Sequence, residues 1–143
     1  VLALAYVMNF SGQTIAMGTY LAGLGTVYAF LAPALGWIGT AVTGSDTSAN
    51  ALFAKLQVSA AENLQHAGIH GATPELMLAA NTTGGVVGKM ISPQSLAIAA
   101  TSVDMEGKES DILKAVLPWS FGMLVVVCIL VFLQTNVLSF LVP

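Results

Sequence analysis

The stretch AVLPWSFGMLVVVCILVFLQTNVLSFLVP, residues 115–143, decides the fold. It contains no Lys, Arg, Asp or Glu. An apolar run of about 18 or more residues is long enough to cross a bilayer core about 30 Å thick. We therefore predict a transmembrane helix over residues 115–141. Trp119, Phe121 and Phe140 lie near its ends, where aromatic side chains favour the membrane interface.

The composition of the whole chain agrees with a membrane protein. The sequence is 56% hydrophobic and only 8% charged, its mean hydropathy is +0.83, and no charged residue precedes Asp46. Soluble domains carry about 25% charged residues, which cover their surface. We expect an all-α polytopic membrane protein with one transmembrane region over residues 1–143. The net charge of −3 and the lack of Arg argue against a nucleic-acid partner.

The first half of the chain contains one apolar run after another. Residues 1–8 are apolar, without an initiator Met or a basic region, so we expect residues 1–10 to be the end of a helix that begins upstream rather than a signal peptide. Residues 14–32 are rich in the small residues that let membrane helices approach closely, and a helix is predicted there. Pro33 should end or kink it.

Residues 34–62 have the pattern of a re-entrant hairpin. The apolar arm 34–42 covers only about 14 Å at 1.5 Å per residue, and the polar cluster 43–50 follows it. Non-helical backbone at membrane depth is tolerated where it lines a cavity or is buried in protein. An ordinary span over residues 21–42 with a polar loop after it fits the composition equally well.

The second half repeats this device. After a polar loop at residues 63–74, we predict a broken helix over 75–103 with its break at 81–91, followed by a loop at 104–114. Ser92 and Pro93 are strong signals for the start of its second part. Interrupted apolar segments point to a transporter binding site, because open helix ends offer unpaired N–H and C=O groups to ligands.

Asp46 is one candidate functional residue, because it stands among hydroxyl and amide side chains between apolar arms. Burial favours the neutral form of a carboxylate, so Asp46 could carry a proton or bind a coupling cation. Alternatively, Asp46 or Ser45 simply caps the helix that enters at Ser48.

Lys89 is the second candidate, since it is the only cation between Lys55 and Lys108. An intramembrane Lys indicates a functional site by default, and the helix start at Ser92 could face the same carboxylate. A Lys that extends from a helix end to the interface is the alternative.

Other motifs are weaker. The glycine-rich segment around Lys89 lacks the phosphate-loop pattern, because Thr83 stands five residues before Gly88. Glu62, His66 and His70 have four-residue spacing, but three groups in a polar loop make a poor metal site. Neither an enzyme activity, nor a metal, nor a cofactor is expected.

Four segments carry a resemblance to a known family. They are GWIG (residues 36–39), TGSDTSANALF (43–53), AANTTGGVVGKMISPQS (79–95) and GKESD (107–111). Together, in this order, they resemble the C-terminal end of the bacterial L-lactate permeases, whose full-length members are several times longer.

The resemblance implies a multi-pass protein of the bacterial inner membrane that takes up L-lactate, and often glycolate, with protons. It also implies an inverted-repeat fold in which this chain supplies most of the second repeat, beside an N-terminal remainder, and it favours the re-entrant hairpin. A truncated, non-transporting helical subunit and a sodium-coupled carboxylate transporter are the alternatives.

A site follows from these expectations. Lys89 and the N–H groups near Ser92 would hold the substrate carboxylate, and Asp46 would take the coupling proton. The 2-hydroxyl would be bound by Ser45, Asn50, Thr82 and Thr83. Asn81 is a further substrate-binding candidate, and Gly84 and Gly85 would allow close approach. Segments 43–50 and 81–90 should both be non-helical and lie close together.

Overall fold

The computed structural model describes residues 2–25, 27–68, 71–137 and 140. Within these residues the chain forms seven α-helices and no strand. The helices are α1 (Leu2–Phe10), α2 (Gln13–Ala22), α3 (Val27–Thr43), α4 (Asp46–His66), α5 (Pro74–Lys89), α6 (Pro93–Ser102) and α7 (Glu109–Asn136).

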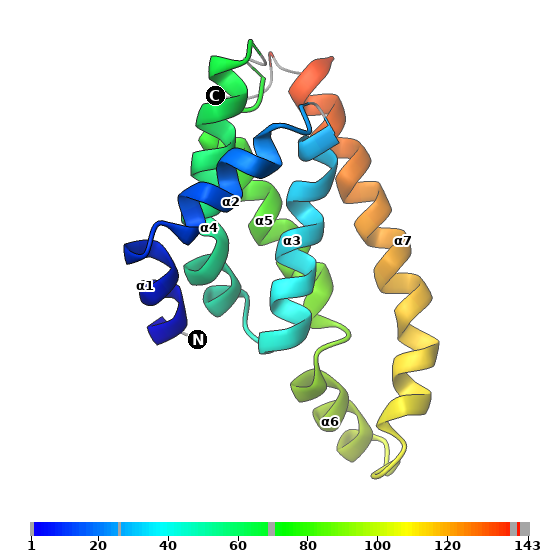
Figure 1. The fold of residues 1–143 in the computed structure, drawn as a ribbon. Helices are drawn as coiled ribbons and strands as arrows, with labels where there is room; N and C mark the ends of the chain where they lie inside the picture. Colours follow the sequence, from blue (N-terminus) through cyan, green and yellow to red (C-terminus); the bar gives the residue numbers. More distant parts are fainter. Residues whose placement is uncertain (1, 26, 69–70, 138–139, 141–143) are drawn as a thin grey trace.

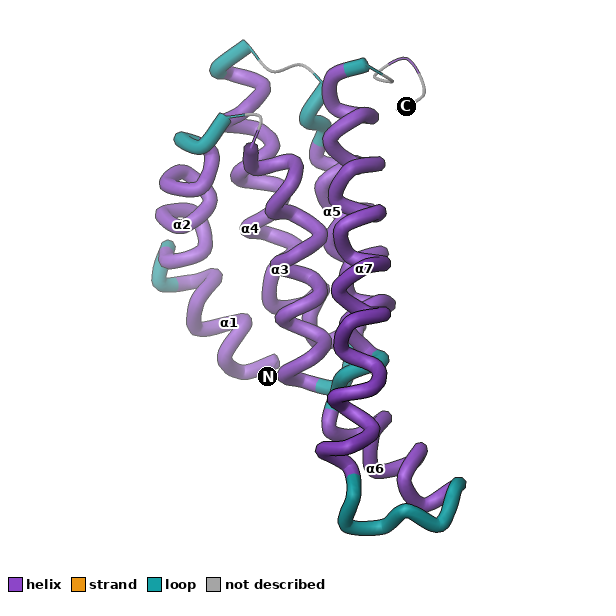
Figure 2. The backbone as a smooth tube through the Cα atoms, turned by 90° about the vertical axis from the view of Figure 1, so that its right-hand side faces the viewer, coloured by secondary structure: helices purple, strands orange, loops and turns teal. Residues whose placement is uncertain are grey.

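Four helices, α3, α4, α5 and α7, run side by side with alternating directions (Figure 1). The helix α3 contacts each of the other three, and α4 also packs on α5. Helices α1 and α2 lie against α4, while α6 projects beyond one end of the bundle and contacts α7 (Figure 2). The α3–α4 turn and the α5–α6 connection lie at this same end.

The contact of α3 with α5 is the most extensive between two described helices, and glycines let their backbones approach closely. A Cβ atom on Gly84 would overlap the Pro33 carbonyl group, and one on Gly88 would overlap the Trp37 carbonyl group. Gly36 is the corresponding small residue on α3, against the α5 backbone. Small residues at such positions let membrane helices approach to backbone contact.

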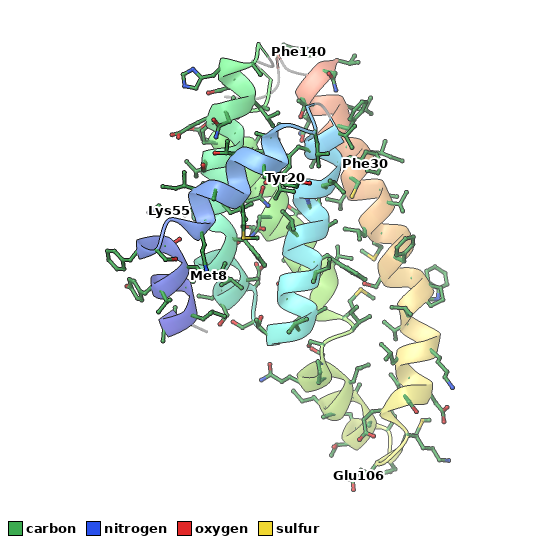
Figure 3. The ribbon with its side chains drawn as sticks, in the orientation of Figure 1. Met8, Tyr20, Phe30, Lys55, Glu106 and Phe140 are labelled. Carbon is green, nitrogen blue, oxygen red and sulfur yellow. The ribbon has the colours of Figure 1, made fainter. Side chains whose placement is uncertain are left out.

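The larger of the two apolar core clusters in the described residues lies mainly between α3, α4 and α5. Its largest members are Tyr28, Leu56, Leu64 and Met77, each 1% exposed or less. Outside this core, large apolar side chains cover much of the surface: Trp119 is 74% exposed and Tyr20 is 82% exposed. Figure 3 shows such side chains around the bundle. An apolar exterior of this extent suits lipid rather than water.

The length of α7 meets the requirement for a membrane span. It has 28 residues, or about 42 Å at 1.5 Å per residue, and it is the one described helix that is both long and apolar enough. The shorter α3 is also apolar. The helix α7 begins at Glu109, inside the loop predicted for residues 104–114, and of the predicted span 115–141 residues 138–139 and 141 lie outside the described part.

The prediction of one helix over residues 14–32, ended or kinked by Pro33, is wrong at its boundaries. The helix α2 ends at Ala22, Gly25 adopts a positive φ of 64°, and α3 then continues through Pro33 to Thr43. Proline lacks the N–H group for one helical hydrogen bond, and the carbonyl group of Pro33 packs against Gly84 of α5. The apolar arm predicted at 34–42 is therefore part of a 17-residue helix.

The polar tip predicted at 43–50 is shorter in the structure. Gly44 turns the chain with a φ of 74°, and the Ser45 side chain accepts a hydrogen bond from Ser48 N at 3.3 Å. Residues 46–50 are helical, and the Ser45 hydroxyl pairs with one of the first N–H groups of α4, that of Ser48. The same helix extends to His66, so the loop predicted at 63–74 begins later.

The predicted break at residues 81–91 is also mostly helical. The helix α5 is continuous to Lys89, and only residues 90–92 interrupt it before Pro93. Its glycines pack against α3 and do not end the helix. The predicted helix start is confirmed: Ser92 is the N-cap of α6 and accepts a hydrogen bond from Ser95 N at 3.3 Å.

Replacing Gly84 with alanine should destabilise the protein by about 2 kcal/mol or more, the range for overpacking in a tight core. The new methyl group would meet the Pro33 carbonyl, which is backbone and cannot turn aside. Thermal unfolding of the purified protein in detergent measures the change. Gly122→Ala on α7 is the matched control, since its Cβ would meet nothing within 4 Å. Equal stability of both variants would contradict the close crossing.

Candidate functional site

The facing sides of α4 and α5 each carry a row of polar residues. On α4, Asp46, Asn50 and Gln57 are separated by four and seven residues, which places them on one helix face. On α5, Thr82 and Lys89 are separated by seven residues and share a face in the same way. Because the two helices pack in opposite directions, the rows lie opposite each other.

Asn50 lies at the centre of this arrangement. Its Oδ1 atom accepts hydrogen bonds from Asn81 Nδ2 at 2.8 Å and from Thr82 Oγ1 at 3.2 Å. Asn81 is fully buried, whereas Thr82 is exposed and Asn50 is half-buried. The structure thus joins three of the residues that the sequence analysis selected, from two segments more than 30 residues apart.

Asp46 lies one turn away, at the first position of α4. Its Oδ1 atom is 3.4 Å from the Thr40 hydroxyl, which is a long hydrogen bond. The carboxylate also lies directly over Gly85 of α5, where any Cβ atom would overlap it. Gly85 therefore has a role that the sequence analysis did not specify: its missing side chain leaves the space that Asp46 occupies.

Lys89 connects the two interruptions in the helices. Its Nζ atom donates to the Gly44 carbonyl at the α3–α4 turn and, at 2.9 Å, to Gln94 Oε1 in the first turn of α6. The ammonium group is half-buried, and both of these partners are neutral oxygens. The prediction that the two polar segments lie close together is therefore confirmed, although their non-helical parts are only Gly44–Ser45 and residues 90–92.

Other predicted site residues have structural contacts of their own. Ser45 and Ser92 cap α4 and α6, as the capping alternative expected for Ser45. Gly84 packs against the backbone of α3. The Thr83 hydroxyl donates to Ala79 O at 2.8 Å, and Thr83 lies in a groove between α5 and α7, away from Asn50.

Sequence reasoning missed Gln57 and Tyr28, which extend the polar row into the core. Gln57 is fully buried, and its Nε2 atom donates to Ala32 O at 3.1 Å and to Asn81 Oδ1 at 3.0 Å. The Tyr28 hydroxyl donates to Gln57 Oε1. The seven-residue spacing between Asn50 and Gln57 was the available signal.

A second buried connection attaches α7 to the site helices. The Ser120 hydroxyl accepts from Trp37 Nε1 at 2.9 Å and donates to the Val87 carbonyl at 3.1 Å. One serine thus satisfies a group on α3 and a group on α5. The Trp37 ring also meets Phe121 edge to face, with centroids 6.4 Å apart.

The remaining candidates do not join this cluster. Glu62 and His66 are exposed near the end of α4, and His70 lies outside the described residues. A hollow of about 400 Å³ on α7, beside Trp119 and Met123, has an almost wholly apolar lining and offers little to a small anion.

Comparison with known proteins identifies the family. The sequence model of L-lactate permease matches residues 1–138. The chain belongs to the L-lactate permease family. It is 46% identical over 143 residues to the L-lactate permeases of Bacillus subtilis and Escherichia coli K12, and 42% identical over 139 residues to glycolate permease GlcA of Escherichia coli K12. No solved structure matches the chain.

These relatives are much longer than the chain. All of the chain is covered in the match with the B. subtilis permease, but only 24% of that permease is. The resemblance found in the sequence is therefore confirmed at the level of the family, which is a family of transporters rather than enzymes and implies a membrane location.

Ser120→Ala should lower the free energy of unfolding by about 1–3 kcal/mol, the cost of leaving a buried polar group unpaired. The substitution removes the acceptor of Trp37 Nε1, while the Val87 carbonyl loses one donor and keeps the bond from Met90 N. Thr135→Val on the same helix is the control, because that buried hydroxyl donates only to Val131 O in its own helix. Thermal unfolding in detergent compares the two. A larger loss with Thr135→Val would rule out the bridging role of Ser120.

Proposed function

We propose that this chain forms part of the carboxylate-binding site of a bacterial inner-membrane permease for L-lactate, and also for glycolate, that is coupled to protons. The observation that supports this most is the environment of Lys89. A half-buried ammonium group lies where the α3–α4 turn meets the α5–α6 connection, and its two hydrogen-bond acceptors are neutral. A small carboxylate would supply the negative charge.

Two helix N-termini strengthen the positive potential around Lys89. The helix α4 begins at Asp46, directly after the Gly44 carbonyl that Lys89 contacts, and α6 begins at Pro93, next to Gln94. Each N-terminus carries about half an elementary positive charge, and the cap serines Ser45 and Ser92 each accept from one N–H group of their helix. A monocarboxylate at this place would be stabilised by the ammonium group and by both helix ends.

The substrate's 2-hydroxyl group is assigned to Asn50 and Thr82, whose side chains meet on the accessible side of the α4–α5 interface. Asn81 is fully buried, and both its oxygen and its nitrogen form hydrogen bonds with protein groups. We therefore assign Asn81 the role of supporting Asn50 rather than of binding the substrate. The carboxylate would lie toward Lys89 and the hydroxyl toward Asn50. The relatives named for lactate and for glycolate fit this assignment, because both acids are 2-hydroxy carboxylates.

Asp46 is the proposed proton carrier. Its side-chain partner among the described residues is the Thr40 hydroxyl, at 3.4 Å. One carboxylate with one long hydroxyl contact can gain and lose a proton, whereas cation sites such as those for Ca²⁺ gather 6–8 oxygen ligands. This difference favours proton coupling over the sodium-coupled alternative.

The two helix interruptions are proposed to lie within the membrane boundary. The helices α3 and α5 span about 25 Å and about 24 Å, less than the core thickness of about 30 Å. We propose that α3 and α4 form the re-entrant hairpin of one inverted repeat, with α5 and α6 as its broken helix. The rest of the permease would complete the site, and alternating access would come from one bundle moving against the other.

Lys89→Met in the full-length permease should abolish saturable uptake of L-lactate while leaving membrane insertion intact. The change removes the charge and keeps the length of the side chain. Lys89→Arg should also impair uptake, because a planar guanidinium group does not replace a compact ammonium group in a tight site. Uptake of labelled lactate into proteoliposomes measures both.

The matched control is Lys55→Met, because Lys55 is exposed on α4 and should not contribute to the site. Wild-type affinity for lactate in the Lys89→Met variant would mean that Lys89 only reaches the membrane surface. The proposed site would then be wrong. No lactate uptake by the wild-type permease would instead favour a non-transporting role.

Asp46→Asn should separate lactate exchange from proton-driven accumulation. An amide side chain keeps the size of Asp46 but cannot release a proton in the transport range of pH. We expect accumulation against a gradient to be lost while exchange of internal for external lactate persists. Asp104→Asn, in the exposed loop before α7, is the control. Proton-driven accumulation by the Asp46→Asn variant would rule out Asp46 as the carrier.

A further inference from the structure

The side chains of Tyr28, Gln57, Asn81 and Asn50 form one continuous chain of hydrogen bonds across α3, α4 and α5. Tyr28, Gln57 and Asn81 are completely buried. Each amide in such a chain could in principle face either way, since its oxygen and nitrogen are interchangeable in shape. What fixes the direction of the whole chain is a backbone carbonyl.

The fixed point is the carbonyl of Ala32 on α3, which can only accept. Gln57 must therefore turn its NH₂ group toward Ala32, and the distance between Nε2 and this oxygen is 3.1 Å. The second hydrogen of the same NH₂ group is donated to Asn81 Oδ1 at 3.0 Å. The oxygen of Gln57 then faces Tyr28, whose hydroxyl donates to it.

The orientation of Gln57 determines the next two amides. With Asn81 Oδ1 occupied by Gln57, Asn81 presents Nδ2 to Asn50, and Asn50 Oδ1 accepts it at 2.8 Å. The Thr82 hydroxyl donates to the same oxygen. The oxygen of Asn50 is thus filled by two donors, and its Nδ2 group is left at the free end of the chain.

This free end is accessible. Within the described residues every buried side-chain nitrogen or oxygen has a hydrogen-bond partner, and Asn50 itself is half-buried. Asn50 Nδ2 forms no hydrogen bond to a described residue, so it can donate to a ligand that enters between α4 and α5. Its position, one helical turn from Asp46, lies inside the site proposed above.

We propose that Gln57 is a positioning residue for substrate selection: through Asn81 it holds Asn50 with Nδ2 directed at the 2-hydroxyl oxygen of the substrate. The assignment rests on the proposed function. An amide held in this orientation can only donate at its accessible nitrogen. Its hydrogen bond therefore stabilises a bound acid that has an oxygen at carbon 2 and does not stabilise the same acid without that oxygen. Without Gln57, the Asn81 and Asn50 amides can rotate, and the donor is presented only part of the time.

The test compares L-lactate with propionate, which has the same carbon skeleton and carboxylate but no hydroxyl. Inhibition constants for both acids are measured against labelled lactate uptake by the full-length permease in proteoliposomes. One net hydrogen bond corresponds to a preference of roughly two- to tenfold. Asn50→Ala should remove this factor and leave only the preference that Thr82 supports, and Gln57→Leu should remove part of the same factor. The double variant should be no lower than Asn50→Ala alone.

Tyr28→Phe is the matched control. It removes the hydroxyl that Gln57 Oε1 accepts but leaves the bonds of Gln57 to Ala32 and Asn81, so the amides keep their direction. It should lower thermal stability and leave the preference for lactate over propionate unchanged. A merely structural role for Gln57 would make Gln57→Leu behave like Tyr28→Phe. If Gln57→Leu does not accumulate, Gln57→Glu replaces it, because a neutral carboxyl group keeps the volume and donates only one hydrogen.

The possible results separate the two proposals. A folded Gln57 variant with the wild-type preference overturns the positioning role, as does an unchanged preference in Asn50→Ala. Both results leave the carboxylate site standing if Lys89→Met still abolishes uptake. Unchanged lactate affinity in Lys89→Met overturns the carboxylate site itself. Loss of the lactate preference in Gln57→Leu and Asn50→Ala, but not in Tyr28→Phe, supports the positioning role.

Discussion

The backbone contact between α3 and α5 sets the distances on which the rest of the structure depends. Gly84 and Gly88 place α5 directly on the carbonyl groups of α3, where no side chain could intervene. At that separation, short side chains can link neighbouring helices: Gln57 of α4 reaches both Ala32 of α3 and Asn81 of α5. With larger residues at the crossing these bonds could not form together. The polar network is therefore a consequence of the glycine contact.

An apolar surrounding gives that network its direction as well as its strength. Water would compete for each amide and allow it to turn, but the buried groups have only one another as partners. A single carbonyl that can only accept, Ala32 O, then determines the orientation of every amide up to Asn50. The same surrounding makes the charge of Lys89 costly without a counter-ion. Specificity and affinity in the proposed site thus arise from one physical condition, the exclusion of water.

The sequence was sufficient for features that depend on local chemistry. The apolar span of α7 and the Ser92–Pro93 helix start follow from residue type alone, and both are present. Features that depend on partners were not predictable from one segment. The glycines of residues 84–88 are equally compatible with a break in the helix and with a helix surface that packs closely on a neighbour. The position of α3 shows that they form a packing surface. Gln57 was overlooked because its neighbourhood is polar, although its own side chain is buried.

The contacts are distributed unevenly between the two ends of the bundle. The part of the bundle around Tyr28, Leu56 and Met77 is stabilised by the apolar core and by the chain of amide hydrogen bonds. The helix α6, in contrast, packs mainly on α7. Lys89 connects α6 to the α3–α4 turn, because its ammonium group donates both to Gln94 of α6 and to the Gly44 carbonyl of the turn. An ammonium group has three N–H donors, and Gly44 and Gln94 use two of them. The third donor can therefore bind a carboxylate while α6 stays connected to the turn.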